Sequence, residues 1–247
     1  MSELGELERT LLRPAVGTFT EDELEGLPEP VRRLFRAAVA PGTPLARSAR
    51  IAMRGEIRLK KWTSFRGTEV LAPLEGFVWS VRAGPISGYD RYVRGEGEMR
   101  WKLLGLVPVM RADGPDVSRS AAGRFAAEGI WLPTALLPRF GVAWSAVDDR
   151  HVVAVLRVDV HEVTVHFALD DDARVRACWF DRWGDPDETG AYAFHPFGLE
   201  ATAHRTFGGV TIPSCGVAGW HWGTHRWPAS AFFRYEITGL EPVGPSS

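Results

Sequence analysis

The feature that most constrains this chain is a long series of short segments in which apolar and polar residues alternate. Between residues 151 and 160, apolar side chains occupy every second position: Val152, Ala154, Leu156 and Val158. A repeat of two residues is typical of a β-strand with one buried face. About a dozen segments of this kind follow one another between residues 46 and 241. Many short strands with short connections indicate an antiparallel sandwich or barrel rather than an α/β fold.

Two segments have the helical period instead. Residues 20–40 carry apolar side chains at helical spacing, and Pro30 suits the first turn of the firm part of this helix. In residues 116–129, Asp116 suits the N-cap and Gly129 suits the C-terminal end. Helices should therefore flank or interrupt the strands at two places.

The domain organisation follows from these segments. No change of composition and no linker rich in Pro, Gly or Ser divides the chain. We expect a mainly β (α+β) protein with a single domain over residues 1–247. Its helical N-terminal segment covers about residues 20–40, and its β domain covers about residues 46–241, with the helix 116–129 inserted. A chain of this size can bury a core without metals or disulfides.

Charge, cysteine content and absent motifs exclude several classes of protein. The chain has 29 basic and 31 acidic residues, for a formal net charge of −2, and so lacks the positive field of a nucleic-acid binder. Its two cysteines, Cys178 and Cys215, have no metal-ligand spacing, and we expect no metal. Since no Walker loop, GxGxxG fingerprint or GxSxG elbow occurs, we also expect no cofactor.

The distribution of apolar residues bears on location. No run of 18 apolar residues occurs, so we expect no membrane span. The N-terminus is charged and has no long apolar core, unlike a secretory signal. We therefore expect a cytoplasmic protein.

The helical segment 116–129 carries charge where apolar residues are expected. Arg124 and Glu128 are four residues apart, and both fall on the apolar stripe of this helix. A charged pair on a core-facing side is costly unless it is paired and hydrogen-bonded. One interpretation is a catalytic set of Asp116, Arg124 and Glu128 beside an apolar cavity, with a carboxylate as acid or base. The alternative is a structural ion pair that fixes the helix to the sheet.

Two further groups of residues are candidates for binding a substrate. Asp90, Tyr92 and Glu98 share one face if their strand continues without a bulge, although such a row is often only solvated. Ten tryptophans is a high number for this length, and such residues line a pocket for an apolar ligand or fill an aromatic core. The tryptophans that we select as candidate ligand contacts are Trp79, Trp101, Trp131, Trp220 and Trp222.

Two blocks of sequence resemble a bacterial family of uncharacterised proteins, recorded as a domain of unknown function. They are GFVWSVRAGPISGYDRYVRGEGEMRWKLLGLVPV (76–109) and DVSRSAAGRFAAEGIWLPTALLP (116–138), and the N-terminal LPEPVRRLFRAAV agrees with them. The family is similar in fold to periplasmic lipoprotein carriers. The resemblance implies a curved antiparallel sheet, wrapped as an incomplete barrel around one or two short helices, with an apolar cavity for a lipophilic ligand.

Three functions remain open at this point. The first is a cofactor-independent enzyme of bacterial specialised metabolism (a biosynthetic cyclase, lyase or isomerase) that acts on a small substrate in the cavity. The second is a non-catalytic binding or carrier protein for a lipid or another hydrophobic metabolite. The third is a subunit that depends on a protein partner, or a homodimer with an exposed apolar patch.

Overall fold

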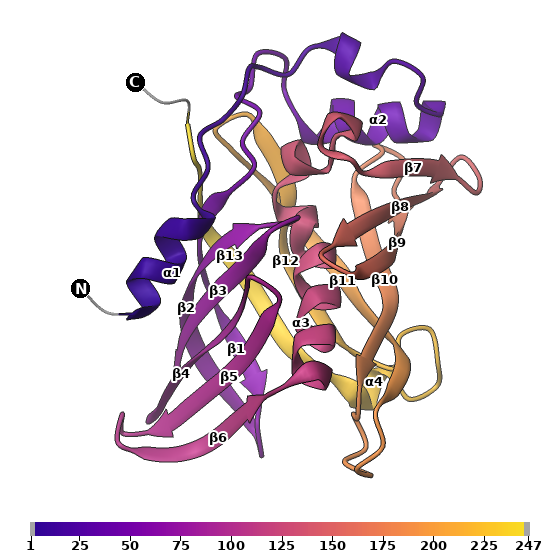
Figure 1. The fold of residues 1–247 in the computed structure, drawn as a ribbon. Coiled ribbons are helices and arrows are strands. Elements are labelled where there is room, and N and C mark those ends of the chain that lie inside the picture. The colour runs from indigo at the N-terminus through magenta and orange to yellow at the C-terminus, as the bar shows by residue number, and fades with distance from the viewer. Residues whose placement is uncertain (1–2, 245–247) are drawn as a thin grey trace.

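The computed structural model describes residues 3–244, which contain one antiparallel sheet of 13 strands (Figure 1). The ends of the expected domain 1–247 lie outside the described residues. The strands in chain order are β1 (Ala49–Arg58), β2 (Trp62–Ala72), β3 (Gly76–Ala83), β4 (Ile86–Val93), β5 (Glu96–Leu103), β6 (Val107–Asp113), β7 (Ala143–Ala146), β8 (His151–Val158), β9 (His161–Leu169), β10 (Val175–Gly184), β11 (Ala193–Phe207), β12 (Val210–Trp220) and β13 (Ala231–Pro242).

The strand order explains why the sheet stays open. Its order is β6-β5-β4-β3-β2-β1-β13-β12-β11-β10-β9-β8-β7, so β6 and β7 are its two edges. Each half is a meander of consecutive strands, and the halves join where β1 pairs with β13. Because β6 and β7 are consecutive in the chain, the segment between them has to cross from one edge of the sheet to the other.

That crossing segment places a helix inside the curve of the sheet. Helix α3 (Pro115–Glu128) follows β6 directly and packs against β5, β9 and β10 (Figure 1). Short 3-10 turns continue it toward β7: η2 (Gly129–Trp131), η3 (Pro133–Leu136) and η4 (Pro138–Phe140). The sheet is therefore an incomplete barrel around α3, and the predicted fold class is confirmed.

The remaining helical segments lie at the outside of the sheet or at its ends. They are α1 (Glu3–Leu11), the 3-10 turn η1 (Glu21–Leu24), α2 (Glu29–Ala38) and the short α4 (Trp227–Ser230). Apolar residues of α2, of the concave face and of α3 form the main core cluster. A smaller cluster joins Leu11 of α1 to Val70 and Val78 of β2 and β3.

Several sequence expectations about elements need correction. The helix expected over residues 20–40 is divided into η1 and α2, because Gly26 has φ +75° and Pro28 precedes the first turn of α2. The short strand β7 and the helix α1 were not expected, and β11 is one long strand where the sequence pattern predicts two short ones, at residues 192–194 and 199–207. None of the described helices is long and apolar enough to cross a membrane.

Candidate functional site

A large cavity lies between the concave face of the sheet and α3, with a volume of about 760 Å³. This lies in the range of about 300–1,000 Å³ in which proteins hold small ligands. Strand β10 shows how the period of two builds the wall, because alternate residues line the cavity: Cys178, Phe180, Arg182 and Gly184. The other large apolar side chains of the wall include Phe77, Trp79, Trp101, Trp131, Phe197, Leu199, Trp220, Phe232, Phe233 and Tyr235.

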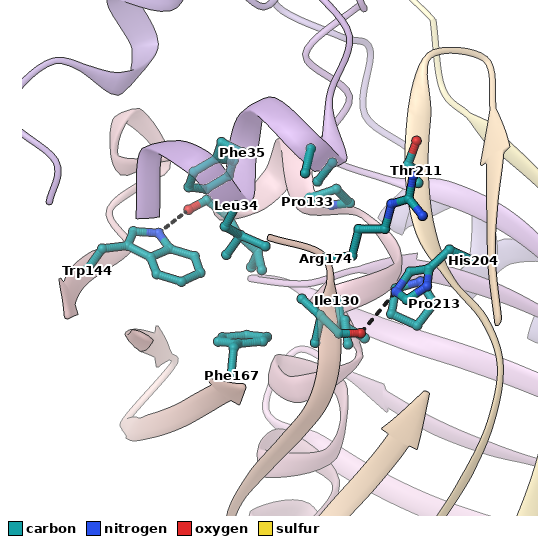
Figure 2. Close-up of a pocket in the computed structure, with 14 residues that line it drawn as sticks. Leu34, Phe35, Ile130, Pro133, Trp144, Phe167, Arg174, His204, Thr211 and Pro213 are labelled. Carbon is teal, nitrogen blue, oxygen red and sulfur yellow. Dashed lines mark hydrogen bonds between the residues drawn. The ribbon is translucent and has the colours of Figure 1, made fainter. Parts of the chain in front are cut away.

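A second, small pocket lies between α2 and the sheet (Figure 2). Leu34 and Phe35 of α2 face Trp144 and Phe167 across it, and its volume is only about 30 Å³. That space holds one or two water molecules at most. The indole of Trp144 donates to the carbonyl oxygen of Leu136 at 2.8 Å. This pocket is therefore a gap in packing, and the large cavity is the candidate site.

Arg124 is the centre of the polar part of the large cavity. Its guanidinium donates to Asp90 Oδ2 at 2.7 Å and to Glu128 Oε1 at 2.8 Å. The side chain also lies 4.6 Å from the ring of Phe77 and 5.1 Å from that of Trp79, within the range of cation–π attraction. Burial alone would lower the pKa of Arg124, but Glu128 and Asp90 raise it above its usual value, so the guanidinium stays charged.

Asp90 connects this ion pair to an aromatic wall. Its Oδ1 accepts a hydrogen bond of 2.8 Å from the indole nitrogen of Trp101. Trp101 in turn lies 5.8 Å from Trp79, ring centre to ring centre. Both oxygens of Asp90 are therefore bound within the protein, one to Trp101 and one to Arg124.

Glu69 of β2 is a buried acid behind this network. Its side chain is only 1% exposed, and no donor within the described residues contacts either of its carboxyl oxygens. Burial, together with the negative charge of Glu128, raises the pKa of Glu69 well above its ordinary value. The raised pKa favours the protonated form of Glu69, which has a proton to donate toward Glu128, whose Oε2 has no hydrogen-bond partner in the described residues.

Arg182 of β10 is a second cation in the wall of the cavity. Its Nε donates to Ser120 Oγ of α3 at 3.2 Å, and its guanidinium lies 4.8 Å from the ring of Phe197 and 5.0 Å from that of Trp220. Within residues 3–244, no carboxylate lies within 4.0 Å of it. Burial and the like charge of Arg124 lower the pKa of Arg182 to about 9, which is still above neutral pH.

The structure brings most of the sequence candidates to the cavity. Arg124 and Glu128 meet as their spacing predicts, and their side chains are 18% and 14% exposed. The candidates that line the cavity are Trp79, Asp90, Glu98, Trp101, Arg124, Glu128, Trp131 and Trp220. Their roles in binding or catalysis stay predictions.

Asp116 does not join Arg124 and Glu128. It lies in the first turn of α3, is exposed, and accepts a hydrogen bond of 2.8 Å from the indole of Trp183. The expectation that all three charged side chains point into the hollow is therefore wrong for Asp116. The physical reason is position: more than two helical turns separate Asp116 from Arg124.

The expectation that Asp90, Tyr92 and Glu98 share one face holds for Asp90 and Tyr92, which lie opposite Trp79 and Phe77 of β3, and is wrong for Glu98. Strand β4 ends at Val93, and the turn through Arg94 and Gly95, both with positive φ, pairs Val93 with Glu96. In this register Glu98 lies opposite Arg91, not opposite Asp90.

The contacts of these residues agree with that register. Glu98 accepts hydrogen bonds from Tyr89 at 3.1 Å and from Arg91 at 2.9 Å, and a third from Arg100. Tyr92 is fully buried, does not line the cavity, and donates to Asp159 Oδ2 at 2.5 Å. Neither residue offers a free polar group to a ligand.

Trp222 differs from Trp220 in a similar way. Strand β12 ends at Trp220, and His221 has φ +59°, which interrupts the alternation of faces. Trp222 therefore stacks on Trp179 at 6.0 Å and does not line the cavity. Of these two candidate ligand contacts, only Trp220 therefore lies at the cavity.

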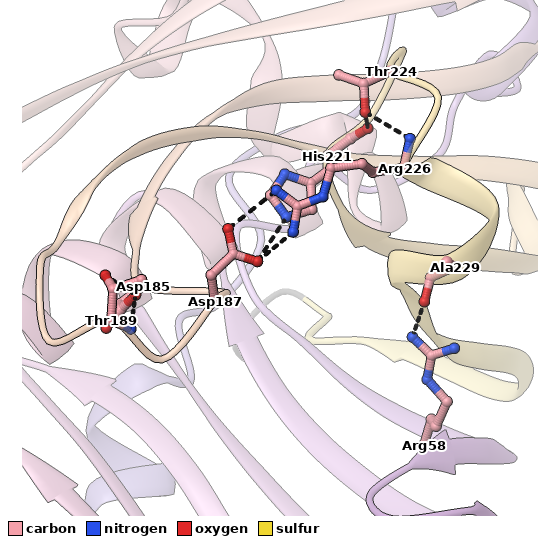
Figure 3. A network of polar contacts seen from close by, with 8 residues as sticks. All are labelled: Arg58, Asp185, Asp187, Thr189, His221, Thr224, Arg226 and Ala229. Atoms are coloured by element: carbon pink, nitrogen blue, oxygen red, sulfur yellow. Dashed lines mark hydrogen bonds and ion pairs between the residues drawn. The ribbon is translucent and has the colours of Figure 1, made fainter.

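His221 belongs instead to a polar network where the β10–β11 loop meets the segment before α4 (Figure 3). Its Nε2 lies 3.7 Å from Asp187 Oδ1, and Arg226 forms an ion pair with the same carboxylate at 3.1 Å. Arg58 of β1 donates to the carbonyl oxygen of Ala229 (Figure 3). These residues also line the cavity, so the network forms part of its border.

Besides the border residues Arg58, Asp187 and Arg226, sequence reasoning missed two ionisable residues near Arg124, namely Glu69 and Arg182. The register places Glu69 opposite Trp79, on the inward face of β2, and the same alternation places Arg182 two residues after Phe180. The sequence pattern predicts a strand over residues 174–181, which ends one residue before Arg182. Extending the period of two by one residue would have found it.

The sequence predicted no metal site, and the side chains that could form one are His, Cys, Asp and Glu. Among the described residues, no group of three or more His, Cys, Asp or Glu side chains is arranged to hold a metal ion. Both cysteines are free, and burial raises the pKa of the Cys178 thiol to about 12.

Comparisons with known proteins bear on family and fold. The sequence pattern of DUF6544, a family of unknown function, matches residues 17–232. No curated protein matches the chain. A crystal structure of an outer membrane lipoprotein-sorting protein domain from Vibrio parahaemolyticus is 9% identical, with a TM-score of 0.44, and the match covers 86% of this chain and 90% of that one.

A second solved structure matches at similar coverage. It is a LolA superfamily protein from Nitrosomonas europaea, 10% identical, with a TM-score of 0.42, and the match covers 84% of this chain and 91% of that one. The sequence resemblance to an uncharacterised family is thus confirmed.

Proposed function

The chain belongs to DUF6544, a family of unknown function, and we propose that it binds or carries an apolar small molecule in the cavity around α3. The observation that carries this proposal is the cavity itself. It has a volume of about 760 Å³ and a wall made mainly of aromatic and aliphatic side chains. Transfer of an apolar ligand from water into such a cavity is favourable by roughly 25 cal/mol for each Å² of apolar surface that is buried.

The charged residues of the wall support binding rather than catalysis. A general base has to lie within hydrogen-bonding reach of the substrate, in an orientation that lets it take the proton. Both oxygens of Asp90 are bound within the protein, and Glu128 is bound by Arg124 on one oxygen and interacts electrostatically with the buried acid Glu69. These contacts are those of a structural ion network. The enzymatic interpretation, with its biosynthetic role and its independence of cofactors, stays a prediction.

A titration with N-phenyl-1-naphthylamine, a neutral apolar dye that fluoresces when it is bound, tests the proposal. Ala121 on α3 and Ala218 on β12 both line the cavity, so Ala121→Phe and Ala218→Phe should each fill part of it. We expect wild type to bind the dye and each variant to bind it about tenfold more weakly or worse. The matched control is Ala203→Phe at an exposed position of β11, which should bind like wild type.

Two results would contradict the proposal. One is a wild-type protein that gives no saturable signal with the dye. The other is a signal that all three phenylalanine variants retain equally, because the dye would then bind outside the cavity. The expectations of a cytoplasmic location and of a protein partner or homodimer stay predictions that this experiment does not address.

A further inference from the structure

We propose that the ligand of this cavity is an amphiphile with an anionic head group, a carboxylate or a phosphate, and that Arg182 binds this head group. The inference rests on the proposed function and adds the chemical class of the ligand. It starts from a contrast between the two arginines of the wall, Arg124 and Arg182. Arg124 forms ion pairs with two carboxylates of the protein, whereas Arg182 forms none within the described residues.

The contacts of Arg182 leave the hydrogen-bonding end of its guanidinium free. Only Nε has an acceptor, Ser120 Oγ, and within residues 3–244 the two terminal nitrogens have none. Arg124, by comparison, uses its nitrogens on both Asp90 and Glu128. The negative charges of Glu128 and Asp90 raise the pKa of Arg182, but both carboxylates already form ion pairs with Arg124.

The surroundings of Arg182 hold its plane in place. The rings of Phe197 and Trp220 lie 4.8 Å and 5.0 Å from the guanidinium carbon, and Ser120 fixes Nε. A guanidinium that is held flat and open presents two parallel N–H groups, which match the two oxygens of a carboxylate or phosphate. Burying a cation in a mostly apolar wall without a counterion is unfavourable in free energy. An anionic group of the ligand would provide the counterion that the protein does not.

The position of Arg182 along β10 also orients the ligand. The inward residues that follow it are Gly184 and the loop containing Asp187, which forms the polar border of the cavity. The inward residues that precede it are Phe180 and Cys178, both buried. The head group therefore lies toward the polar border, and the apolar chain extends inward along Phe180.

Three probes with the same chain and different head groups test this inference: dodecanoate, dodecyl phosphate and dodecan-1-ol. We expect wild type to bind at least one of the two anions about 10- to 100-fold more tightly than the alcohol, as expected for a hydrogen bond to a charged group. Arg182→Gln should bind all three with about the affinity that wild type shows for the alcohol. Arg176→Gln, on the same strand but exposed, should keep the preference of wild type.

Each outcome decides the inference. If dodecan-1-ol binds wild type as tightly as both anions do, the head-group site is overturned while the proposed function stands. If Arg182→Gln keeps the preference for an anion, the anion binds elsewhere and the inference is overturned. If neither the alcohol nor the neutral dye binds wild type, the proposed function fails with it.

The preference of wild type is also measurable without the variant, in case Arg182→Gln fails to fold. A ligand that binds only the native state raises the melting temperature according to its affinity. Dodecanoate or dodecyl phosphate should therefore raise the melting temperature of wild type more than dodecan-1-ol does at equal concentration. Equal shifts would overturn the inference.

Discussion

At the scale of single residues, Asp90 has the most consequential contacts in the site. It accepts from Trp101 and from Arg124, and its side chain is only 7% exposed. Removing it would leave a guanidinium and an indole N–H without an acceptor in a mostly buried place. The loss of stability comes more from leaving these buried donors without an acceptor than from the hydrogen bonds themselves.

We therefore expect Asp90→Ala to lower the free energy of unfolding by about 2–4 kcal/mol. The control is Asp116→Ala, on an exposed residue at the start of α3, which should cost less than about 1 kcal/mol. Urea denaturation of both variants measures the difference. Equal losses would show that the network around Arg124 does not stabilise the fold.

Glu69 gives the site a characteristic dependence on pH. Because burial raises its pKa in the native state, the native protein keeps a proton that the unfolded chain releases. Stability from this residue is then fully present at low pH and falls as the pH rises above the ordinary value of 4.5. Gln at this position mimics the neutral acid and can still donate to Glu128.

The expected result is that Glu69→Gln gains melting temperature relative to wild type as the pH is raised from about 4 to about 8. Thermal unfolding in a series of buffers measures it. Glu96→Gln, at the exposed first position of β5, serves as the control and should follow wild type at every pH. A constant difference between Glu69→Gln and wild type across the series would mean that Glu69 is ionised in the folded protein.

Some of these residue contacts follow from the sequence, and others do not. A spacing of four residues on a helix fixes neighbours, so the pairing of Arg124 with Glu128 could be predicted. The partners Asp90 and Glu69 come from strands distant in the chain, and only the sheet register brings them close to Arg124. Long-range pairing of this kind has no local signal in one sequence.

At the scale of elements, the close approach of α3 to β5 determines the shape of the site. Gly97 of β5 donates its backbone N–H to Ser118 Oγ at 2.8 Å. A side chain on Gly97 would meet the backbone of α3, since its Cβ would lie 2.7 Å from Ser118 Cα and 2.9 Å from Val117 O. The helix can lie this close only because residue 97 is glycine.

We expect Gly97→Ala to lower the free energy of unfolding by about 1–3 kcal/mol, since backbone atoms cannot move aside as a flexible side chain does. The matched control is Gly239→Ala on β13, where the nearest atom to the new Cβ is Ala52 Cβ at an ordinary 3.6 Å. Chemical denaturation compares the two. Similar stabilities for both variants would contradict the close contact between α3 and β5.

The elements that could be predicted are those with an uninterrupted period. The alternation in residues 151–160 and the helical spacing after Asp116 both correspond to observed elements, β8 and α3. The predictions fail where one residue with an unusual backbone conformation turns the residues after it to the opposite face of the sheet. His221, with φ +59°, turns Trp222 away from the cavity, and the turn at Arg94 moves Glu98 to the other face.

At the scale of the whole molecule, the function depends on the way the chain leaves one edge of the sheet and returns to the other. The strand order makes β6 and β7 distant edges, and α3 crosses between them inside the curve. The helix fills only part of the hollow, which leaves a cavity of about 760 Å³. The strand pattern predicted consecutive antiparallel strands, and only the family resemblance implied an incomplete barrel. The volume left beside α3 could not be predicted from the sequence.

The central claim is that this hollow is occupied by a ligand. Native mass spectrometry of the protein, purified without detergent from cells of its own organism, measures this most directly. The account predicts a complex of one protein with one apolar or amphipathic small molecule, which separates on denaturation and is lost in Ala218→Phe. A protein that has only the mass of its own chain, and that takes up no dye or dodecyl probe when these are added, would contradict it.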